Sequence, residues 1–238
     1  MRIPLPLLLL CALAAWADGP LEGLVLPYRQ VDLSAPVSSF IVELKVREGE
    51  TVKAGQPLLQ LYGKLEELEM SRAKAQLERR EYEARGIKSL YDNKILPEAK
   101  SMDARAELEL ARLNYETAAE QVRLRTLLSP IDGTVAERFR EAGEAVTPGQ
   151  AIFRILNLSK VFIVCAVKPD QLAHLALGQK RVVRLPQLEG EPPLLAEVVF
   201  IEPRADAAGS FKVQLLADNP DQRLRAGLKA LVEAPECH

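Results

Sequence analysis

Two stretches decide the fold of this chain: EGETVKAGQ at residues 48–56 and AGEAVTPGQ at residues 142–150. They lie 94 positions apart, and at the same offset APVSSFIVE (35–43) aligns with SPIDGTVAE (129–137). The pairs that are identical at this offset are Pro36/Pro130, Glu43/Glu137, Gly49/Gly143, Glu50/Glu144, Val52/Val146, Gly55/Gly149 and Gln56/Gln150. Glycine supplies the positive φ that tight turns need. Each copy therefore predicts strands separated by a Gly-Glu turn and a Gly-Gln turn, and the chain contains an internal β repeat.

The segment between the two copies, residues 65–127, follows a different period. It is rich in strong helix formers, and its only glycine and proline are Gly86 and Pro97. Apolar residues recur there at steps of three and four, in one stripe of Met70, Ala73, Leu77, Ala84, Ile87 and Tyr91 and a second of Ala104, Leu108, Ala111, Tyr115, Ala118 and Val122. This spacing is typical of a coiled-coil seam. With a breaker at 92–97 between them, the stripes predict an antiparallel helical hairpin.

The two ends of the chain give further predictions. Residues 1–17 combine Arg2, a short apolar run and the small-x-small pattern Ala15-Trp16-Ala17, which indicates a cleaved export signal. Residues 18–30 are expected to form an N-terminal extended segment. Residues 158–235 alternate with period two, so that Val161, Ile163, Cys165 and Val167 share one face. The pattern predicts a small antiparallel barrel or sandwich.

Composition and motifs exclude several classes of function. The chain has 31 basic and 33 acidic residues and only 5% aromatic residues, which argues against nucleic-acid binding. No nucleophile-elbow, phosphate-loop or zinc-protease motif is present, and the histidines are His174 and His238 alone. We therefore expect no enzymatic activity, no cofactor and no metal site. Cys165 is expected to be a buried small hydrophobe, and whether it pairs with Cys237 stays open.

The half-motifs, together with LLSPIDGTV at 127–135 and the run 211–228, resemble the periplasmic adaptors, or membrane fusion proteins (HlyD/RND type), of tripartite efflux and secretion systems. The resemblance implies a mainly β fold with an inserted α-helical hairpin. It divides the chain into a split biotinyl/lipoyl-like domain at 31–64 and 128–157, an antiparallel coiled coil at 65–127 and a small antiparallel β-barrel domain at 158–235. Many members of that family also carry a membrane-proximal domain after the barrel, and as a departure from their pattern we expect no room for one after residue 235.

The same resemblance implies a non-enzymatic periplasmic adaptor that links an inner-membrane transporter, of RND or ABC type, to an outer-membrane channel as a homo-oligomeric ring. The residues expected to make the outward contact lie at the hairpin tip: Leu90, Asn93, Lys94, Ile95 and Pro97. Family members often carry an Arg, a Leu four positions on and a Ser seven further at this tip. If Leu90 is that Leu, Gly86 and Pro97 stand in the places of Arg and Ser.

Two alternatives from other classes of protein stay open. A lipoyl or biotinyl carrier domain would hold its cofactor on a lysine between the two halves, and Lys64 is the lysine near that point. The flanking sequence Tyr62-Gly63-Lys64-Leu65 fits a solvated strand-to-helix junction better. A free-standing periplasmic binding or regulatory module would act without membrane partners.

Overall fold

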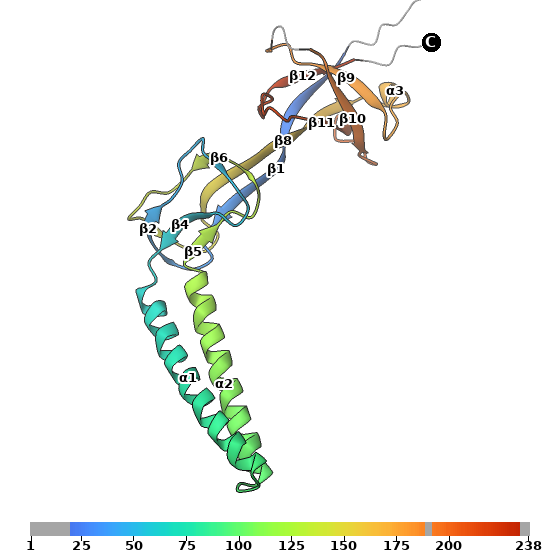
Figure 1. Cartoon of the computed structure of the whole chain (residues 1–238). Helices are drawn as coiled ribbons and strands as arrows, with labels where there is room; N and C mark the ends of the chain where they lie inside the picture. The colour runs from blue at the N-terminus through green and yellow to red at the C-terminus, as the bar shows by residue number, and fades with distance from the viewer. Residues whose placement is uncertain (1–19, 189–191, 234–238) are drawn as a thin grey trace, which may run out of the picture. The chain divides into compact units, whose positions relative to one another are not determined.

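A computed structural model describes residues 20–188 and 192–233 (Figure 1). The predicted export signal at 1–17 and the Cys237-His238 pair lie outside the described residues. The chain divides into two compact units, with the boundaries after Tyr28 and after Asn157. We call residues 29–157 the repeat unit, and residues 20–28 with the described part of 158–233 the barrel unit.

The repeat unit contains both half-motifs and the helical hairpin between them. Its elements are β2 (Ser39–Leu44), β3 (Thr51–Val52), β4 (Pro57–Leu61), α1 (Lys64–Asp92), α2 (Glu98–Arg123), β5 (Thr126–Leu128), β6 (Gly133–Arg138) and β7 (Ala145–Val146). Two longer strands, β1 (Leu21–Ser34) and β8 (Ala151–Val167), also contribute residues to it. A four-stranded sheet has the order β5-β4-β2-β7, while β3, β6 and β8 pair in a second sheet.

The two half-motifs are related by an internal twofold symmetry, and even individual backbone hydrogen bonds are equivalent in the two halves. Thr51 of β3 pairs with Thr134 of β6, and at the offset of 94 Ala145 of β7 pairs with Phe40 of β2. The Gly49 N–H donates to the carbonyl of Val135 and the Gly143 N–H to that of Ile41, both at 2.8 Å. Each half also shows the same irregularity, because β2 shifts register between Ile41 and Glu43 and β6 between Val135 and Glu137. The repeat in the sequence is therefore a repeat of backbone geometry.

The core of the repeat unit lies between its two sheets. Both halves contribute matching apolar side chains, and the fully buried ones include Ile41, Val52, Leu58, Leu59, Leu61, Val135, Val146, Ile152, Phe153 and Ile155. Because these side chains point inward from both sheets, the residues that alternate with them on β2 and β6 face outward on opposite sides. This alternation follows directly from the period of two in each half-motif.

The helical hairpin consists of α1 and α2, which pack against each other (Figure 1). The predicted stripes are the less exposed positions of both helices, with Ala111 and Ala118 buried on α2. Arg80 interrupts the stripe of α1, and its guanidinium donates to Glu83 of the same helix at 2.8 Å and to Glu107 of α2 at 2.6 Å. A hydrogen bond from Arg79, together with the one from Arg80, holds the pKa of the Glu83 carboxyl below its ordinary value. The basic residue in the stripe thus crosslinks the two helices.

The barrel unit is a ring of paired strands. Its remaining elements are α3 (Pro169–Leu172), β9 (Lys180–Arg184), β10 (Leu194–Ile201), β11 (Phe211–Asp218) and β12 (Lys229–Val232). The order β1-β12-β9-β10-β11-β8 closes on itself because β1 also pairs with β8. The predicted inward face is confirmed, since Val161, Ile163, Cys165 and Val167 are each at most 1% exposed.

The mainly β fold with an inserted helical hairpin is confirmed, and the bounds of the elements add detail at three of the predicted boundaries. The extended segment predicted at 18–30 contains most of β1, which continues from Leu21 to Ser34 and pairs with β12. The division between the two units after Asn157 coincides with the predicted boundary at 157/158, and it falls within the single strand β8. The hairpin ends at Arg123, and residues 126–128 already pair with β4. Among the described residues, no helix is both long and apolar enough to span a membrane.

Candidate functional site

The tip of the helical hairpin is a tightly hydrogen-bonded turn. α1 ends at Asp92, and the N–H of Lys94 donates to the carbonyl of Tyr91 while that of Ile95 donates to the carbonyl of Leu90, both at 2.8 Å. This pair of bonds is a Schellman motif, which satisfies the last carbonyls of a helix when the residue after the C-cap is left-handed. Lys94 occupies that position with φ of 60°. The turn therefore has one defined conformation.

The second half of the tip begins α2. Pro97 precedes its first residue, Glu98, and has the extended φ of −70° and ψ of 153° that suit a helix N-terminus. The side-chain amide of Asn93 donates to the carbonyl of Ser89 at 2.8 Å. The five residues expected at the tip are thus brought together by one turn, in which Leu90 and Ile95 are joined through their backbones.

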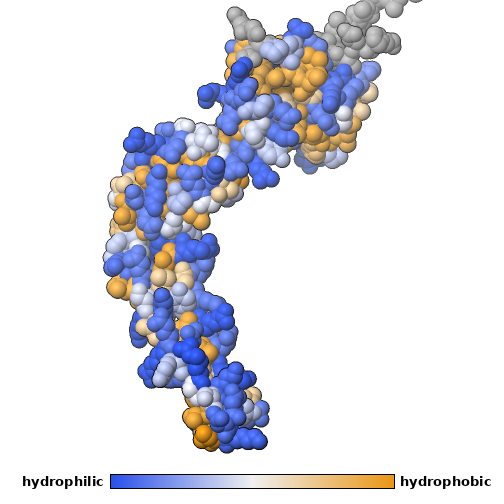
Figure 2. All heavy atoms as spheres, viewed as in Figure 1, coloured by the Kyte–Doolittle hydropathy of each residue, from blue (hydrophilic) through white to orange (hydrophobic). Residues whose placement is uncertain are grey.

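The tip exposes apolar side chains to solvent. Ile95 is 65% exposed and Leu90 is 41% exposed. Figure 2 shows apolar residues gathered at this end of the hairpin, where α1 ends and α2 begins in Figure 1. A third residue, Met102, was not singled out from the sequence and is 62% exposed in the second turn of α2. Its position outside the apolar stripe was the signal that could have found it. The tip offers apolar contacts on a rigid turn but no reactive group.

The residues weighed as carriers of chemistry occupy ordinary structural positions. Lys64 is the first residue of α1 and forms an exposed ion pair with Glu67 at 3.4 Å. His174 is exposed near α3. Cys165 is buried, and burial raises the pKa of its thiol to about 11, so its reactive thiolate form is disfavoured. Within residues 20–188 and 192–233, His, Cys, Asp and Glu do not form a group of three that could hold a metal ion.

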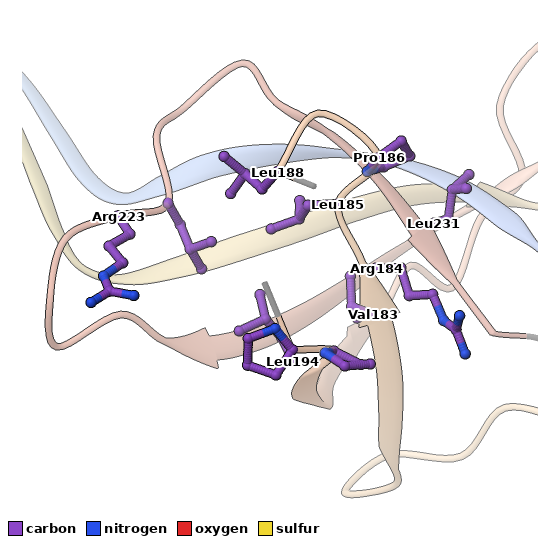
Figure 3. Close-up of a pocket in the computed structure, with 11 residues that line it drawn as sticks. Val183, Arg184, Leu185, Pro186, Leu188, Leu194, Arg223 and Leu231 are labelled. Atoms are coloured by element: carbon purple, nitrogen blue, oxygen red, sulfur yellow. The ribbon is translucent and has the colours of Figure 1, made fainter. Parts of the chain in front are cut away.

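The barrel unit contains an apolar hollow of about 410 Å³ (Figure 3). Figure 3 shows Leu185, Leu188 and Leu194 around a common space, with Arg184 and Arg223 at its two ends. The Arg184 guanidinium already donates to the Glu233 carboxylate at 2.8 Å. Ligand pockets usually combine apolar walls with a few convergent polar groups. The described walls of this hollow are mostly apolar, and its two arginines lie at opposite ends and do not converge, so we assign no ligand to it.

Comparison with known proteins relates the chain to one family. Residues 29–158 match the family described as RND MFP, barrel-sandwich hybrid domain. The solvent efflux pump periplasmic linker SrpA of Pseudomonas putida and the multidrug resistance protein MexA of Pseudomonas aeruginosa are each 26% identical over 223 residues. These matches cover 87% of this chain and 58% of each relative. The chain thus spans little more than half the length of the curated relatives it matches.

Solved structures show the same fold. A MacA-MexA chimeric protein that contains the α-hairpin domain of Pseudomonas aeruginosa MexA superposes with a TM-score of 0.79 at 24% identity, covering 90% of this chain and 78% of that one. A putative efflux transporter from Bacteroides eggerthii gives a TM-score of 0.71 at 24% identity, covering 89% and 67%. The family match extends over more than half of the sequence, including both half-motifs and the hairpin. The chain belongs to the RND-type membrane fusion proteins, the family of periplasmic adaptors.

Proposed function

We propose that this chain is a non-enzymatic periplasmic adaptor that links an inner-membrane transporter of the RND type to an outer-membrane channel for efflux. Membership in the adaptor family supports this role, as do relatives named as periplasmic linkers of efflux pumps. The chain would reach the periplasm through the export signal at residues 1–17 and associate with the inner membrane through its transporter.

The domains are assigned to this role as follows. Residues 31–64 and 128–157 form a split lipoyl-like domain, residues 65–127 an antiparallel coiled coil, and residues 158–235 a β-barrel domain. Copies of the chain assemble into a ring around the transporter through the lipoyl-like domains. The internal twofold of the repeat unit and the three- and four-residue spacing along α1 and α2 support these assignments.

The observation that carries the proposal is the hairpin tip. Leu90 and Ile95 stand exposed on a turn that two backbone hydrogen bonds hold in one conformation. Exposed apolar side chains on a rigid element form a contact at low entropic cost. The tip, with Leu90, Asn93, Lys94, Ile95 and Pro97, is therefore assigned to the outer-membrane channel.

Photo-crosslinking in intact Gram-negative cells tests this assignment. A photoreactive amino acid replaces Ile95 at the tip or, as a control, Leu68 near the other end of α1, which is 56% exposed. Irradiation followed by mass spectrometry identifies the attached proteins. We expect an outer-membrane channel to be attached from position 95 and not from position 68.

Substitution supplies the functional half of the test. Ile95→Asp places a charge in the apolar contact and should abolish export of a pump substrate, whereas Leu68→Asp should leave export unchanged. Attachment of only soluble periplasmic proteins at position 95, together with normal export by the Ile95→Asp variant, would instead identify a free-standing periplasmic module.

A further inference from the structure

At the base of the hairpin the chain turns from strand to helix over a single residue. Tyr62 still belongs to the sheet, because its N–H donates to the Phe40 carbonyl of β2 and its carbonyl accepts from the Ser39 hydroxyl, both at 2.9 Å. The helical hydrogen bonds of α1 begin at the next residue, where the Gly63 carbonyl accepts from the Glu67 N–H at 3.0 Å. Gly63 therefore forms the corner between β4 and α1.

The side chain of Arg125 lies across this corner. Its backbone belongs to the sheet, since its carbonyl accepts from the Leu61 N–H at 2.7 Å. One N–H of the Arg125 guanidinium donates to the Tyr62 carbonyl at 3.2 Å, and another donates to the carboxylate of Glu66 in the first turn of α1. These two acceptors stand on either side of Gly63. Arg125 thus joins the last residue held by the sheet to the start of the helix.

The ion pair of Arg125 with Glu66 is shielded from solvent. The two side chains are 16% and 19% exposed, whereas those of Arg80 and Glu107, which join the two helices farther along the hairpin, are 33% and 54% exposed. Water and salt screen a partly buried pair less than an exposed one. The pair at the base is therefore the less screened of these two connections.

The packing at the corner explains why residue 63 is a glycine. Its φ is −150°, so a left-handed backbone is not the reason. A Cβ at this position would lie 2.7 Å from the Cγ of Arg125 and 3.2 Å from its Cβ. These atoms are next to the backbone of the arginine, and they cannot swing aside as the end of a long side chain can. A side chain at residue 63 and the observed position of Arg125 therefore exclude each other.

We propose that Arg125 is a brace that fixes the angle at which α1 leaves β4, and with it the direction in which the hairpin leaves the sheet. Hinges are usually a few residues at the ends of elements, and a side chain bonded on both sides of such a residue restricts its φ and ψ. The consequence for docking rests on the proposed function, because a hairpin held in one direction loses less entropy when its tip binds a partner. The brace itself does not depend on that role.

Distances between two spin labels on the purified full chain, measured by double electron–electron resonance, test the brace. One label is attached to Thr147→Cys, beside β7, and the other to Glu109→Cys, on α2, and both positions are exposed. Cys11→Ser and Cys237→Ser remove the other thiols outside the described residues, and Cys165 is buried. The chain with its natural Arg125 should give one narrow distribution of distances across the corner.

Loss of the brace should widen this distribution. Arg125→Gln removes the charge and shortens the side chain, so we expect the distribution to become about twice as wide as the corner residue gains freedom to rotate. Glu66→Gln removes the ion pair but leaves the bond from Arg125 to the Tyr62 carbonyl, and it should widen the distribution by less.

A change on the other side of the contact tests the same brace without removing the arginine. Gly63→Ala displaces the Arg125 side chain and should widen the distribution about as much as Arg125→Gln does. In an Arg125→Ala background the obstructing Cγ is gone and only the contact with the Cβ at 3.2 Å is left. There Gly63→Ala should add almost no further width.

Arg123→Gln is the matched control. Arg123 pairs with Glu120 of the same helix, and the two side chains are 65% and 51% exposed. Its loss should leave the distribution unchanged, since this pair does not span the corner. An unchanged width in both Arg125→Gln and Gly63→Ala, or equal widening by Arg123→Gln, would overturn the proposal.

This measurement needs no membrane partner, so the brace and the adaptor role can fail separately. A narrow distribution in Arg125→Gln, together with loss of export by the Ile95→Asp variant, rejects the brace and leaves the adaptor role intact. A wide distribution in Arg125→Gln, together with normal export by Ile95→Asp, supports the brace and rejects the role of the tip.

Discussion

The two halves of the repeat unit, residues 35–61 and 129–155, share backbone hydrogen bonds at equivalent turns but differ in most of their side chains. Some of these differences fall where one half has a local constraint that the other lacks. Four such positions are Gly133 against Ser39, Asp132 against Ser38, Pro148 against Ala54 and Arg154 against Gln60. Comparing these positions distinguishes residues that the fold needs in both halves from residues that only one half needs.

The largest expected effect concerns Gly133. A Cβ at this position would lie 2.5 Å from the carbonyl oxygen of Leu156, so β6 and β8 approach too closely for a side chain. In the other half, Ser39 has a side chain whose hydroxyl donates to the carbonyl of Tyr62 at 2.9 Å. We expect Gly133→Ser to lower the free energy of unfolding by about 3 kcal/mol through overpacking. Ser39→Gly should cost about 1 kcal/mol, since it removes one exposed bond and adds backbone freedom.

Urea unfolding of the two variants measures this contrast. Equal losses at positions 133 and 39 would show that the two strand pairs are equally spaced, contrary to the structure.

The next largest effect concerns a pair of glycines that is identical in the two halves. Gly49 and Gly143 lie in equivalent turns, with φ of 82° and 90°, and a Cβ at either would meet no atom within 4 Å. The cost of Gly→Ala is therefore backbone strain alone, about 1–2 kcal/mol at each position. We expect Gly49→Ala and Gly143→Ala to shift the urea midpoint by nearly the same amount. If the two variants differed in free energy of unfolding by more than about 1 kcal/mol, one turn would not be under the strain that its φ indicates.

A smaller effect comes from the second turn of each half. The Asp132 carboxylate accepts a bond from the Ala54 N–H at 2.8 Å. The residues at the equivalent places are Ser38 and Pro148, and proline has no N–H to satisfy. We expect Asp132→Ala to cost about 1 kcal/mol in the natural chain. In an Ala54→Pro background the same change should cost almost nothing.

A double-mutant cycle of these two substitutions, followed by thermal unfolding, gives the coupling directly. The prediction is wrong if Asp132→Ala is equally costly in both backgrounds. Arg72→Ala, on the exposed side of α1, serves as a control that should show no coupling to Ala54→Pro.

The smallest effect concerns charge. The Arg154 guanidinium donates to Asp32 at 2.7 Å and to Glu137 at 2.9 Å, while the equivalent pair is neutral, with the Thr126 hydroxyl donating to Gln60 at 2.8 Å. The hydrogen bond from Arg154 holds the pKa of the Asp32 carboxyl below its ordinary value of 3.8. Asp32 therefore stabilises the folded state above about pH 4, and this contribution is lost as the pH falls through the lowered pKa.

The combined substitution Asp32→Thr and Arg154→Gln copies the neutral pair. Comparing unfolding midpoints at pH 6 and pH 3, we expect this variant to lose less stability on acidification than the natural chain. The difference should be small because both side chains are partly exposed to solvent. An unchanged response to pH would assign the acid sensitivity to other carboxylates.

The sequence predicted those parts of the fold that repeat or have a clear period. Seven identical pairs located both turns of each half, and the stripes of three and four located α1 and α2. An extended segment was predicted at 18–30, but its place in the sheet of the barrel unit was not, because the inward positions of β1 are Leu21, Gly23 and Val25, and the glycine hides the alternation. A Cβ on Gly23 would lie 2.6 Å from the Sγ of Cys165, so close packing requires the glycine there. The partner of β1, β12, lies at the other end of the chain, beyond the reach of any local pattern.

The tip residues were located by the breaker at 92–97, but their conformation could not be read from sequence. The left-handed position of a Schellman motif is usually glycine or asparagine, and here it is Lys94.

The pairing of β4 with β5 has a consequence for how this protein can change in length. Gln60 lies opposite Thr126, and the Leu61 N–H donates to the Arg125 carbonyl at 2.7 Å, so the strands meet where the chain leaves for α1 and returns from α2. The hairpin joins the rest of the repeat unit at these two adjoining ends. Seven residues added to or removed from each arm would preserve the apolar stripes and leave the junction untouched. The hairpin can therefore be lengthened, shortened or exchanged as a cassette, and selection can adjust the reach of the tip independently of the domain that carries it.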